Sequence, residues 1–222
     1  MQRDQPREPI EAVKPRLRGR LHQFAFFLVV PAGVVLVTMA PTTRARVGAA
    51  IYALSLAGLY GTSTLYHRMP WSPRSHRVMK KLDHSMIFVL IAGTYTPLAL
   101  LVLHGPWKVV TLSVVWGGAA VGILLKFLRI DGLSALTGAL YIALGWMAIV
   151  AMPEIVHGIS GPALSLLFIG GVLYTGGAIV LARNRPNPAP ATYGYHELWH
   201  TCVIAASACH FGLIMMVTLG AR

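Results

Sequence analysis

The chain has 222 residues, of which 55% are hydrophobic and only 12% are charged, and its mean hydropathy is +0.63. This composition is more apolar than a soluble domain tolerates, and it indicates a helical membrane protein. The net charge of +12 does not predict a nucleic-acid partner, because the basic residues lie in short segments between apolar stretches rather than in one patch.

Seven apolar stretches, each near the length that crosses a bilayer as a helix, follow one another along the chain. They cover residues 23–40, 48–67, 83–103, 108–128, 134–152, 161–182 and 196–219. The residues before them are too charged for the apolar region of a signal peptide. The sequence therefore predicts an all-α polytopic bundle of seven transmembrane helices at residues 23–222, after a basic cytoplasmic segment at residues 1–22. A soluble all-helical protein is the alternative, and the recurring uncharged stretches argue against it.

The basic residues also predict the orientation of the bundle. If the N-terminus is cytoplasmic, fifteen of the nineteen Lys and Arg residues lie on the inner side. The outer segments then hold only Arg44, Arg46, Lys108 and Arg222. Cytoplasmic loops are enriched in Lys and Arg, so we expect the N-terminus inside, the C-terminus outside, and a multi-pass protein of the cell inner membrane.

Six polar residues from distant parts of the chain fall at one depth of this predicted bundle, namely Ser63, His67, Asp83, His196, Glu197 and His200. Ser63 and His67 lie four residues apart at the inner end of the second span, and Asp83 opens the third. His196 and His200 lie in the first turns of the last span, on one helix face. Polar and ionisable groups inside a membrane are costly and usually functional, so these residues are expected to form one site.

The residue types fit zinc. His67, His196 and His200 offer three imidazole ligands, which leaves a fourth position for water, as in catalytic zinc sites. Asp83 could orient or deprotonate that water, and Ser63 could hydrogen-bond a substrate carbonyl or the ligand shell. A single histidine near a helix end is more often a hydrogen-bonded interfacial residue, so the prediction depends on the whole group.

Other polar residues have competing interpretations. His196-Glu197-Leu-Trp-His200 also resembles the helix of a zinc protease, in which the Glu is the general base, but this motif opens an apolar span. We expect Glu197 to face headgroups or water. His210 is expected to be a buried hydrogen-bonding residue, and His22 is expected to lie in the basic inner segment, outside the site.

The motifs resemble the three signature motifs of the progestin and adipoQ receptor family. They are Ser63-x-x-x-His67, Lys81-Leu-Asp83-His-Ser85 and His196-x-x-x-His200, and the segment 82–97 is similar to the bacterial hemolysin III branch. The resemblance implies a seven-helix bundle with its N-terminus inside. It also implies zinc held by His67, His196 and His200, with Asp83 acting through water. The family's adiponectin receptors, which are linked to lipid amide hydrolysis, carry an uncharged residue where this chain has Glu197.

The leading functional hypothesis is a zinc-dependent hydrolase of a lipid amide or ester, acting at the cytoplasmic side, with membrane lipids or fatty acyl chains as its partners. A non-enzymatic role, as a pore-forming cytolysin or a regulator of membrane lipid state, is the alternative. Pores usually have a polar stripe along several spans, whereas the polar residues here cluster at one end. An ion transporter is disfavoured by the lack of carboxylates in the middle of the spans.

Overall fold

The computed structural model of the protein describes residues 15–128 and 134–221, and within these ranges the secondary structure is helical apart from one isolated bridge between Ala189 and Tyr193. The elements are α1 Arg20–Met39, α2 Thr43–Arg68, α3 Pro73–Leu101, α4 Gly105–Leu128, α5 Ser134–Gly145, the 3-10 helix η1 Met147–Ile149, α6 Met152–Gly158, α7 Gly161–Arg183 and α8 Tyr195–Leu219. The predicted all-helical class is confirmed for this part of the chain.

Five of these helices, α1, α3, α4, α7 and α8, are long and apolar enough to cross a membrane. A sixth crossing is formed if the segments Leu136–Ile149 and Met152–Gly158 count as one span, although they are bent by 55°. The predicted stretch 134–152 is thus not one continuous helix: α5 ends at Gly145, and Pro153 lies in the first turn of α6, where a proline is tolerated. The protein is a multi-pass membrane protein by these measures.

Helix α2 corresponds to the predicted span 48–67 but does not meet the same length and hydropathy criterion as the other long helices. Its sequence is rich in small residues, and its Gly, Ser, Thr and Tyr residues lower its hydropathy. The reason for this composition is its position, because α2 packs against α1, α3 and α8. Small side chains let helices approach closely inside a membrane. At Gly48, for example, a Cβ atom would lie 3.0 Å from Cα of Pro97 on α3.

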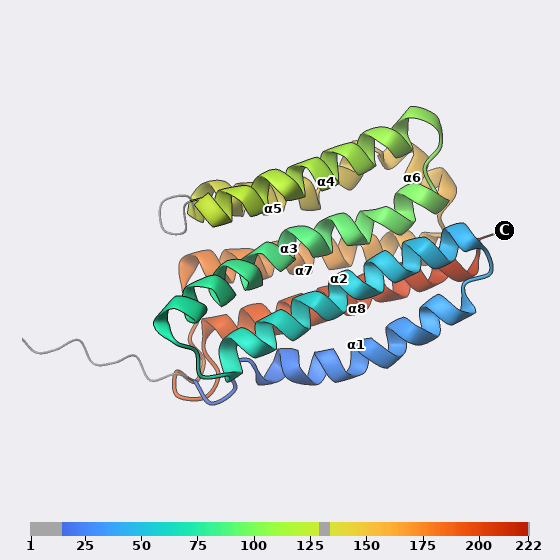
Figure 1. The fold of residues 1–222 in the computed structure, drawn as a ribbon. Helices are drawn as coiled ribbons and strands as arrows, with labels where there is room; N and C mark the ends of the chain where they lie inside the picture. The colour runs from blue at the N-terminus through green and yellow to red at the C-terminus, as the bar shows by residue number, and fades with distance from the viewer. Residues whose placement is uncertain (1–14, 129–133, 222) are drawn as a thin grey trace, which may run out of the picture.

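The long helices run side by side and form an elongated bundle (Figure 1). Helix α1 begins at the end of the bundle opposite the C-terminus. Helix α3 lies between α2 and α4. Helix α7 packs along α8 and makes few contacts with α5 and α6. The ends of α2 and α4 and the starts of α1, α3 and α8 therefore meet at one end of the molecule.

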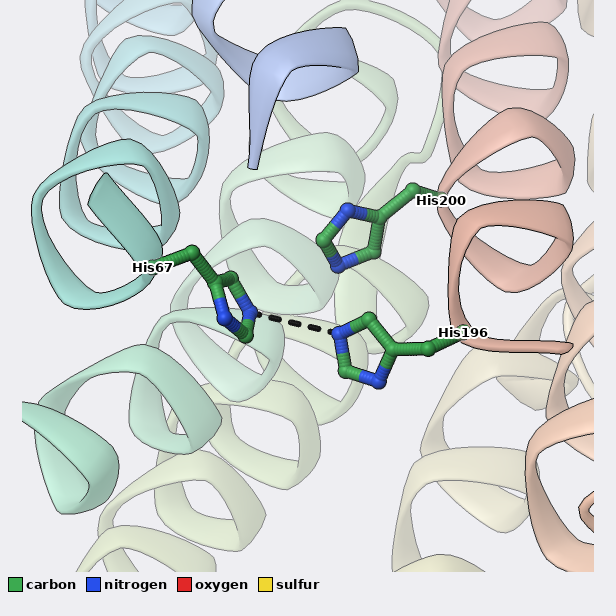
Figure 2. Close-up of side chains that lie close together, drawn as sticks. All are labelled: His67, His196 and His200. Atoms are coloured by element: carbon green, nitrogen blue, oxygen red, sulfur yellow. Dashed lines mark hydrogen bonds between the residues drawn. The ribbon is translucent and has the colours of Figure 1, made fainter. Parts of the chain in front are cut away.

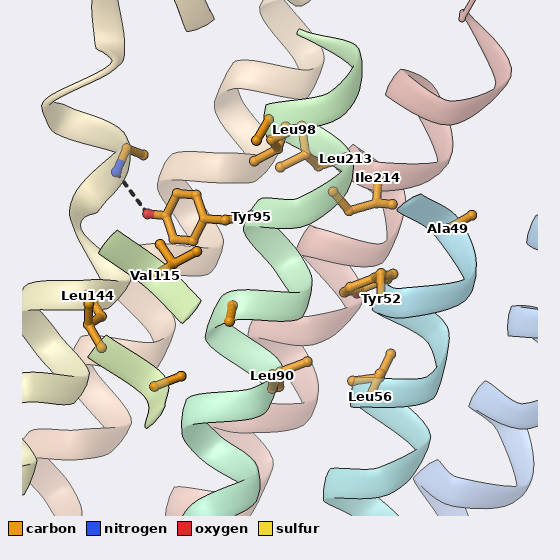
Figure 3. Close-up of a cluster of buried hydrophobic side chains, with 14 of the residues drawn as sticks. Ala49, Tyr52, Leu56, Leu90, Tyr95, Leu98, Val115, Leu144, Leu213 and Ile214 are labelled. Carbon is orange, nitrogen blue, oxygen red and sulfur yellow. Dashed lines mark hydrogen bonds between the residues drawn. The ribbon is translucent and has the colours of Figure 1, made fainter. Parts of the chain in front are cut away.

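The core lies where α2, α3 and α8 face one another (Figure 3). Tyr52 and Leu56 of α2 are one turn apart, which is the spacing of a buried helix face, and they pack near Leu90 of α3. The Tyr95 hydroxyl accepts a hydrogen bond from the N–H of Ala148 at 2.8 Å. This bond ties the break after α5 to the core, which fixes α3 and the wall formed by α5 relative to each other.

Candidate metal centre

Three histidines meet at the end of the bundle where α2 ends and α8 begins. His67 lies in the last turn of α2, while His196 and His200 are one turn apart at the start of α8. One nitrogen of each ring lies within 4.8 Å of the other two, and Nε2 of His67 is 3.2 Å from Nε2 of His196 (Figure 2). His67 and His200 are buried and His196 is half-buried. The rings could therefore hold a metal ion together.

The donor set fits a tetrahedral metal such as zinc. Zinc–imidazole bonds of about 2.0–2.1 Å at a tetrahedral angle place the two nitrogens about 3.3 Å apart. The Nε2 atoms of His67 and His196 are already separated by nearly this distance. Three imidazoles without a fourth side-chain ligand in the group correspond to the open coordination of catalytic zinc sites rather than the closed coordination of structural ones.

Ser63 and Asp83 lie at the same place as the histidines. Ser63 is buried one turn from His67 on α2, and Asp83 lies on the neighbouring helix α3. Both residues line the cavity that the three histidines line. The structure thus places Ser63, Asp83 and the three histidines, from α2, α3 and α8, around one cavity, whereas Glu197, the sixth residue that the sequence pattern selected, does not line it.

His22 also belongs to this cluster, and sequence reasoning missed it. Its imidazole is buried in the first turn of α1 and stacks on His200, with ring centroids 3.7 Å apart and planes 12° apart. Its Nδ1 lies 2.8 Å from Oγ of Ser63. If Ser63 donates its hydrogen to Asp83, its oxygen accepts one from His22. The signal that could have found His22 is its place at the inner end of the first apolar stretch.

Glu197 does not face headgroups or water, contrary to expectation. Its carboxylate is buried, forms an ion pair with Arg18, and accepts a hydrogen bond from the N–H of Gly194 at 2.9 Å. An acidic residue in this position caps the helix and complements the positive end of its dipole. Glu197 is not among the residues that line the cavity. A role as general base, as in the zinc-protease interpretation, therefore has no geometric support.

Residues 15–19, which we call the N-terminal strap, lie across the end of the bundle beside the histidines. The N–H of Arg16 donates to the carbonyl of Ala191 at 3.1 Å, and the N–H of Leu17 donates to that of Thr192 at 3.2 Å. The strap ends at Gly19, whose φ is +78° and at which a Cβ atom would lie 2.6 Å from Cβ of His67. Glycine is therefore required here both for backbone conformation and for close approach.

A cavity of about 2230 Å³ runs from the histidines into the bundle between α3, α5, α7 and α8. It exceeds the roughly 300–1,000 Å³ of pockets for small molecules. Its wall is mainly aliphatic and aromatic beyond the polar end. His210 lies deep in this wall and its Nε2 contacts the carbonyl of Leu167 at 3.3 Å, so the prediction of a buried hydrogen-bonding residue is confirmed.

The cavity reaches the outer surface of the bundle at one side. Ile149 of η1 and Phe168 and Ile179 of α7 line it, yet their side chains are largely exposed, with 61% for Phe168. These residues mark a seam between α5–η1 and α7, where the two elements make few contacts. An apolar cavity that opens through an apolar surface is suited to a ligand with a hydrocarbon chain.

Comparison with known proteins adds a family to this geometry. A sequence profile of the family described as "Haemolysin-III related" matches residues 10–211. The chain is 34% identical over 201 residues to "Hemolysin-3" of Bacillus cereus, covering 89% of each chain. It is 33% identical over 197 residues to "Hemolysin-3 homolog" of Bacillus subtilis (strain 168), covering 87% of this chain and 89% of the relative. It is also 26% identical over 192 residues to "Monocyte to macrophage differentiation factor" of Homo sapiens, covering 83% and 77%.

Proposed function

We propose that this chain, which belongs to the haemolysin-III-related branch of the progestin and adipoQ receptor family, is a zinc-dependent hydrolase of a lipid amide or ester. The observation that carries the proposal is the three-histidine group at the polar end of an apolar cavity. The volume of the cavity accommodates an acyl chain, and the histidines lie where the polar part of such a lipid would end.

The proposed arrangement in the membrane has seven crossings. In this arrangement α2 counts as a span despite its lower hydropathy, and α5, η1 and α6 together form the fifth. The excess of Lys and Arg at the end of the bundle that carries the histidines supports a cytoplasmic N-terminus and an inner-membrane location. The division into a basic segment at 1–22 and a membrane domain at 23–222 stays a prediction, since residues 1–14 lie outside the described part.

In the proposed mechanism His67, His196 and His200 would hold a zinc ion. A zinc ion in such a site polarises a carbonyl oxygen and lowers the pKa of a bound water toward about 7. Asp83, on the cavity wall, accepts the proton of the attacking water and returns it to the leaving amine or alcohol. Ser63, whose hydroxyl contacts Nδ1 of His22, either donates a hydrogen bond to the scissile carbonyl or holds the Asp83 carboxylate in place.

The non-enzymatic alternative has less support from the geometry. The name "Hemolysin-3" belongs to the relatives, and a pore would need polar residues along the length of several helices. The cavity is instead predominantly apolar away from the histidines. A role in membrane lipid state without hydrolysis would use the same cavity, so only a test of turnover separates it from the proposed enzyme.

The test combines metal analysis with turnover. Purified wild-type protein in lipid nanodiscs should contain about one zinc per chain and cleave members of a panel of fluorescent lipid amides and esters. His196→Ala should lose both zinc and turnover, whereas Asp83→Asn should keep zinc and lose turnover. His157→Ala is the matched control, because this histidine is exposed at the other end of the bundle.

Three results would argue against the hydrolase. One is wild-type protein that binds no zinc when zinc is supplied, and another is an Asp83→Asn variant with full turnover. The third is leakage from liposomes that His200→Ala leaves unchanged, in protein with no lipid cleavage, which would favour the pore.

A further inference from the structure

Lys126 is a buried cation with no anion beside it in the described part of the chain. It lies near the end of α4, its side chain is only 8% exposed, and it lines the cavity. The ion pair between Arg18 and Glu197 is the salt bridge found among the described residues, and Lys126 takes no part in it. A lysine buried within a membrane bundle is costly unless it is paired. A negatively charged partner is therefore expected at this point of the cavity.

Two further basic residues line the cavity near Lys126. Lys80 and His84 are four residues apart on α3, and the hydrogen bond from Lys81 to the carbonyl of Phe127 places this part of α3 beside the end of α4 that carries Lys126. Asp83, although next to His84 in the chain, forms no salt bridge with these residues in the described part of the protein. The cluster of Lys80, His84 and Lys126, which we call the basic pocket wall, thus places two ammonium groups and an imidazole at one part of the cavity.

The neighbouring basic residues show that this arrangement is not the ordinary placement of cations at a membrane surface. The ammonium of Lys81 donates to the carbonyl of Phe127 at 2.9 Å and lies 5.5 Å from the centre of that residue's ring. Arg77 is exposed and does not line the cavity. Basic side chains at span ends usually reach outward to headgroups, whereas Lys126 is directed inward.

We propose that the basic pocket wall binds the phosphate group of a lipid whose hydrocarbon chains occupy the cavity. A phosphate monoester carries a charge of about −1.5 to −2 near neutral pH, which matches two ammonium groups better than a single carboxylate does. The apolar cavity beginning at this wall favours a phosphate attached to a lipid over free phosphate. The site is distinct from the three histidines, and binding at it does not depend on hydrolysis.

Binding of short-chain lipids to the full-length protein in a neutral detergent tests the proposal. Dioctanoyl phosphatidic acid should bind at least tenfold more tightly than dioctanoylglycerol, as measured by isothermal titration calorimetry. Lys126→Met should weaken binding of the phosphatidic acid tenfold or more, while Lys126→Arg, which keeps the charge, should largely retain it. Lys80→Gln, at a half-buried position, gives an independent variant if Lys126→Met does not fold. Arg77→Gln, which removes an exposed charge from the same helix, should leave binding unchanged.

Several outcomes would overturn the proposal. They are equal affinity for the two lipids, unchanged affinity in both Lys126→Met and Lys80→Gln, and inorganic phosphate or octanoate binding as tightly as the phosphatidic acid. His196→Ala separates this proposal from the hydrolase: it should lose zinc but bind phosphatidic acid as the wild type does. A protein without lipid cleavage that still binds phosphatidic acid through Lys126 would contradict the hydrolase alone.

Discussion

At the scale of single residues, His22 shows how a side chain from α1 completes a site whose other members come from α2, α3 and α8. Its ring covers one face of His200, and its Nδ1 contacts the hydroxyl of Ser63. It therefore touches a proposed zinc ligand through stacking and a proposed catalytic residue through a hydrogen bond. Because substitutions can remove these two contacts separately, His22 can be used to distinguish effects on zinc binding from effects on turnover.

Substitutions at His22 should separate metal binding from turnover. We expect His22→Phe to keep the stacking on His200 and hence the zinc, but to lose the contact with Ser63 and lower turnover about tenfold, the effect of roughly one hydrogen bond. His22→Ala should lose zinc affinity as well. Zinc titration with a chromophoric chelator and initial-rate assays check both. Full turnover in His22→Phe would show that the hydrogen bond to Ser63 has no part in turnover, and equal zinc affinity in the two variants would show that stacking on His200 does not support the metal.

Gly19 is the second position where one residue determines the site. Gly19→Ala places a side chain at φ +78°, which costs about 1–2 kcal/mol for a non-glycine residue, and brings its Cβ against His67. We expect His67 to move and zinc affinity to fall, as measured by competition with a chelator. Gly117→Ala is the matched control, because a Cβ at Gly117 meets no atom within 4 Å. Unchanged zinc affinity in Gly19→Ala would contradict this account.

At the scale of elements, six of the seven predicted stretches correspond to single helices, because apolar length is visible in the sequence. The break in 134–152 was not predicted, since averaged hydropathy passes over Gly145 and Pro153 without a change. Helix α3 begins at Pro73, ten residues before its predicted span, because Ser72 caps it and the basic first turns are still helical. The sequence thus locates apolar segments better than it locates helix ends.

The candidate site was likewise predicted from the sequence only in part. The predicted topology was enough to place Ser63, His67, Asp83 and the two α8 histidines at a common depth of the membrane. The role of Glu197 could not be predicted, because its partner Arg18 lies 179 residues away in the chain. A contact of this kind depends on how the N-terminal strap folds over the end of the bundle.

The ion pair between Arg18 and Glu197 anchors the N-terminal strap to α8, and breaking it should release the strap. We expect Glu197→Gln to lower stability by about 3 kcal/mol, the low end for a broken buried pair, because Arg18 is 21% exposed and keeps some contact with water. Thermal unfolding of Glu197→Gln, Arg18→Gln and the double variant measures the coupling between the two residues. Additive effects of the two single substitutions would show that the pair does not act as a unit.

At the scale of the whole molecule, the polar residues of the site lie at one end of the bundle, and the apolar cavity extends from them between the helices. The histidines and the basic pocket wall lie at one end of the cavity, and the seam between α5–η1 and α7 opens its side. Helix α7 packs mainly on α8 and makes few contacts with α5 and α6. The proposed active site is built on side chains of helices rather than of loops, which favours precise placement of catalytic groups.

Because of the seam, the detergent around the purified protein should compete with the substrate for the cavity. An alkyl maltoside has a single hydrocarbon tail and a polar head, so it can enter at Phe168 and Ile179 as an acyl substrate would. We expect turnover in micelles to fall as the alkyl chain lengthens from eight to twelve carbons, and to recover after transfer to nanodiscs. Rates that do not depend on tail length would show that substrates reach the histidines by another route.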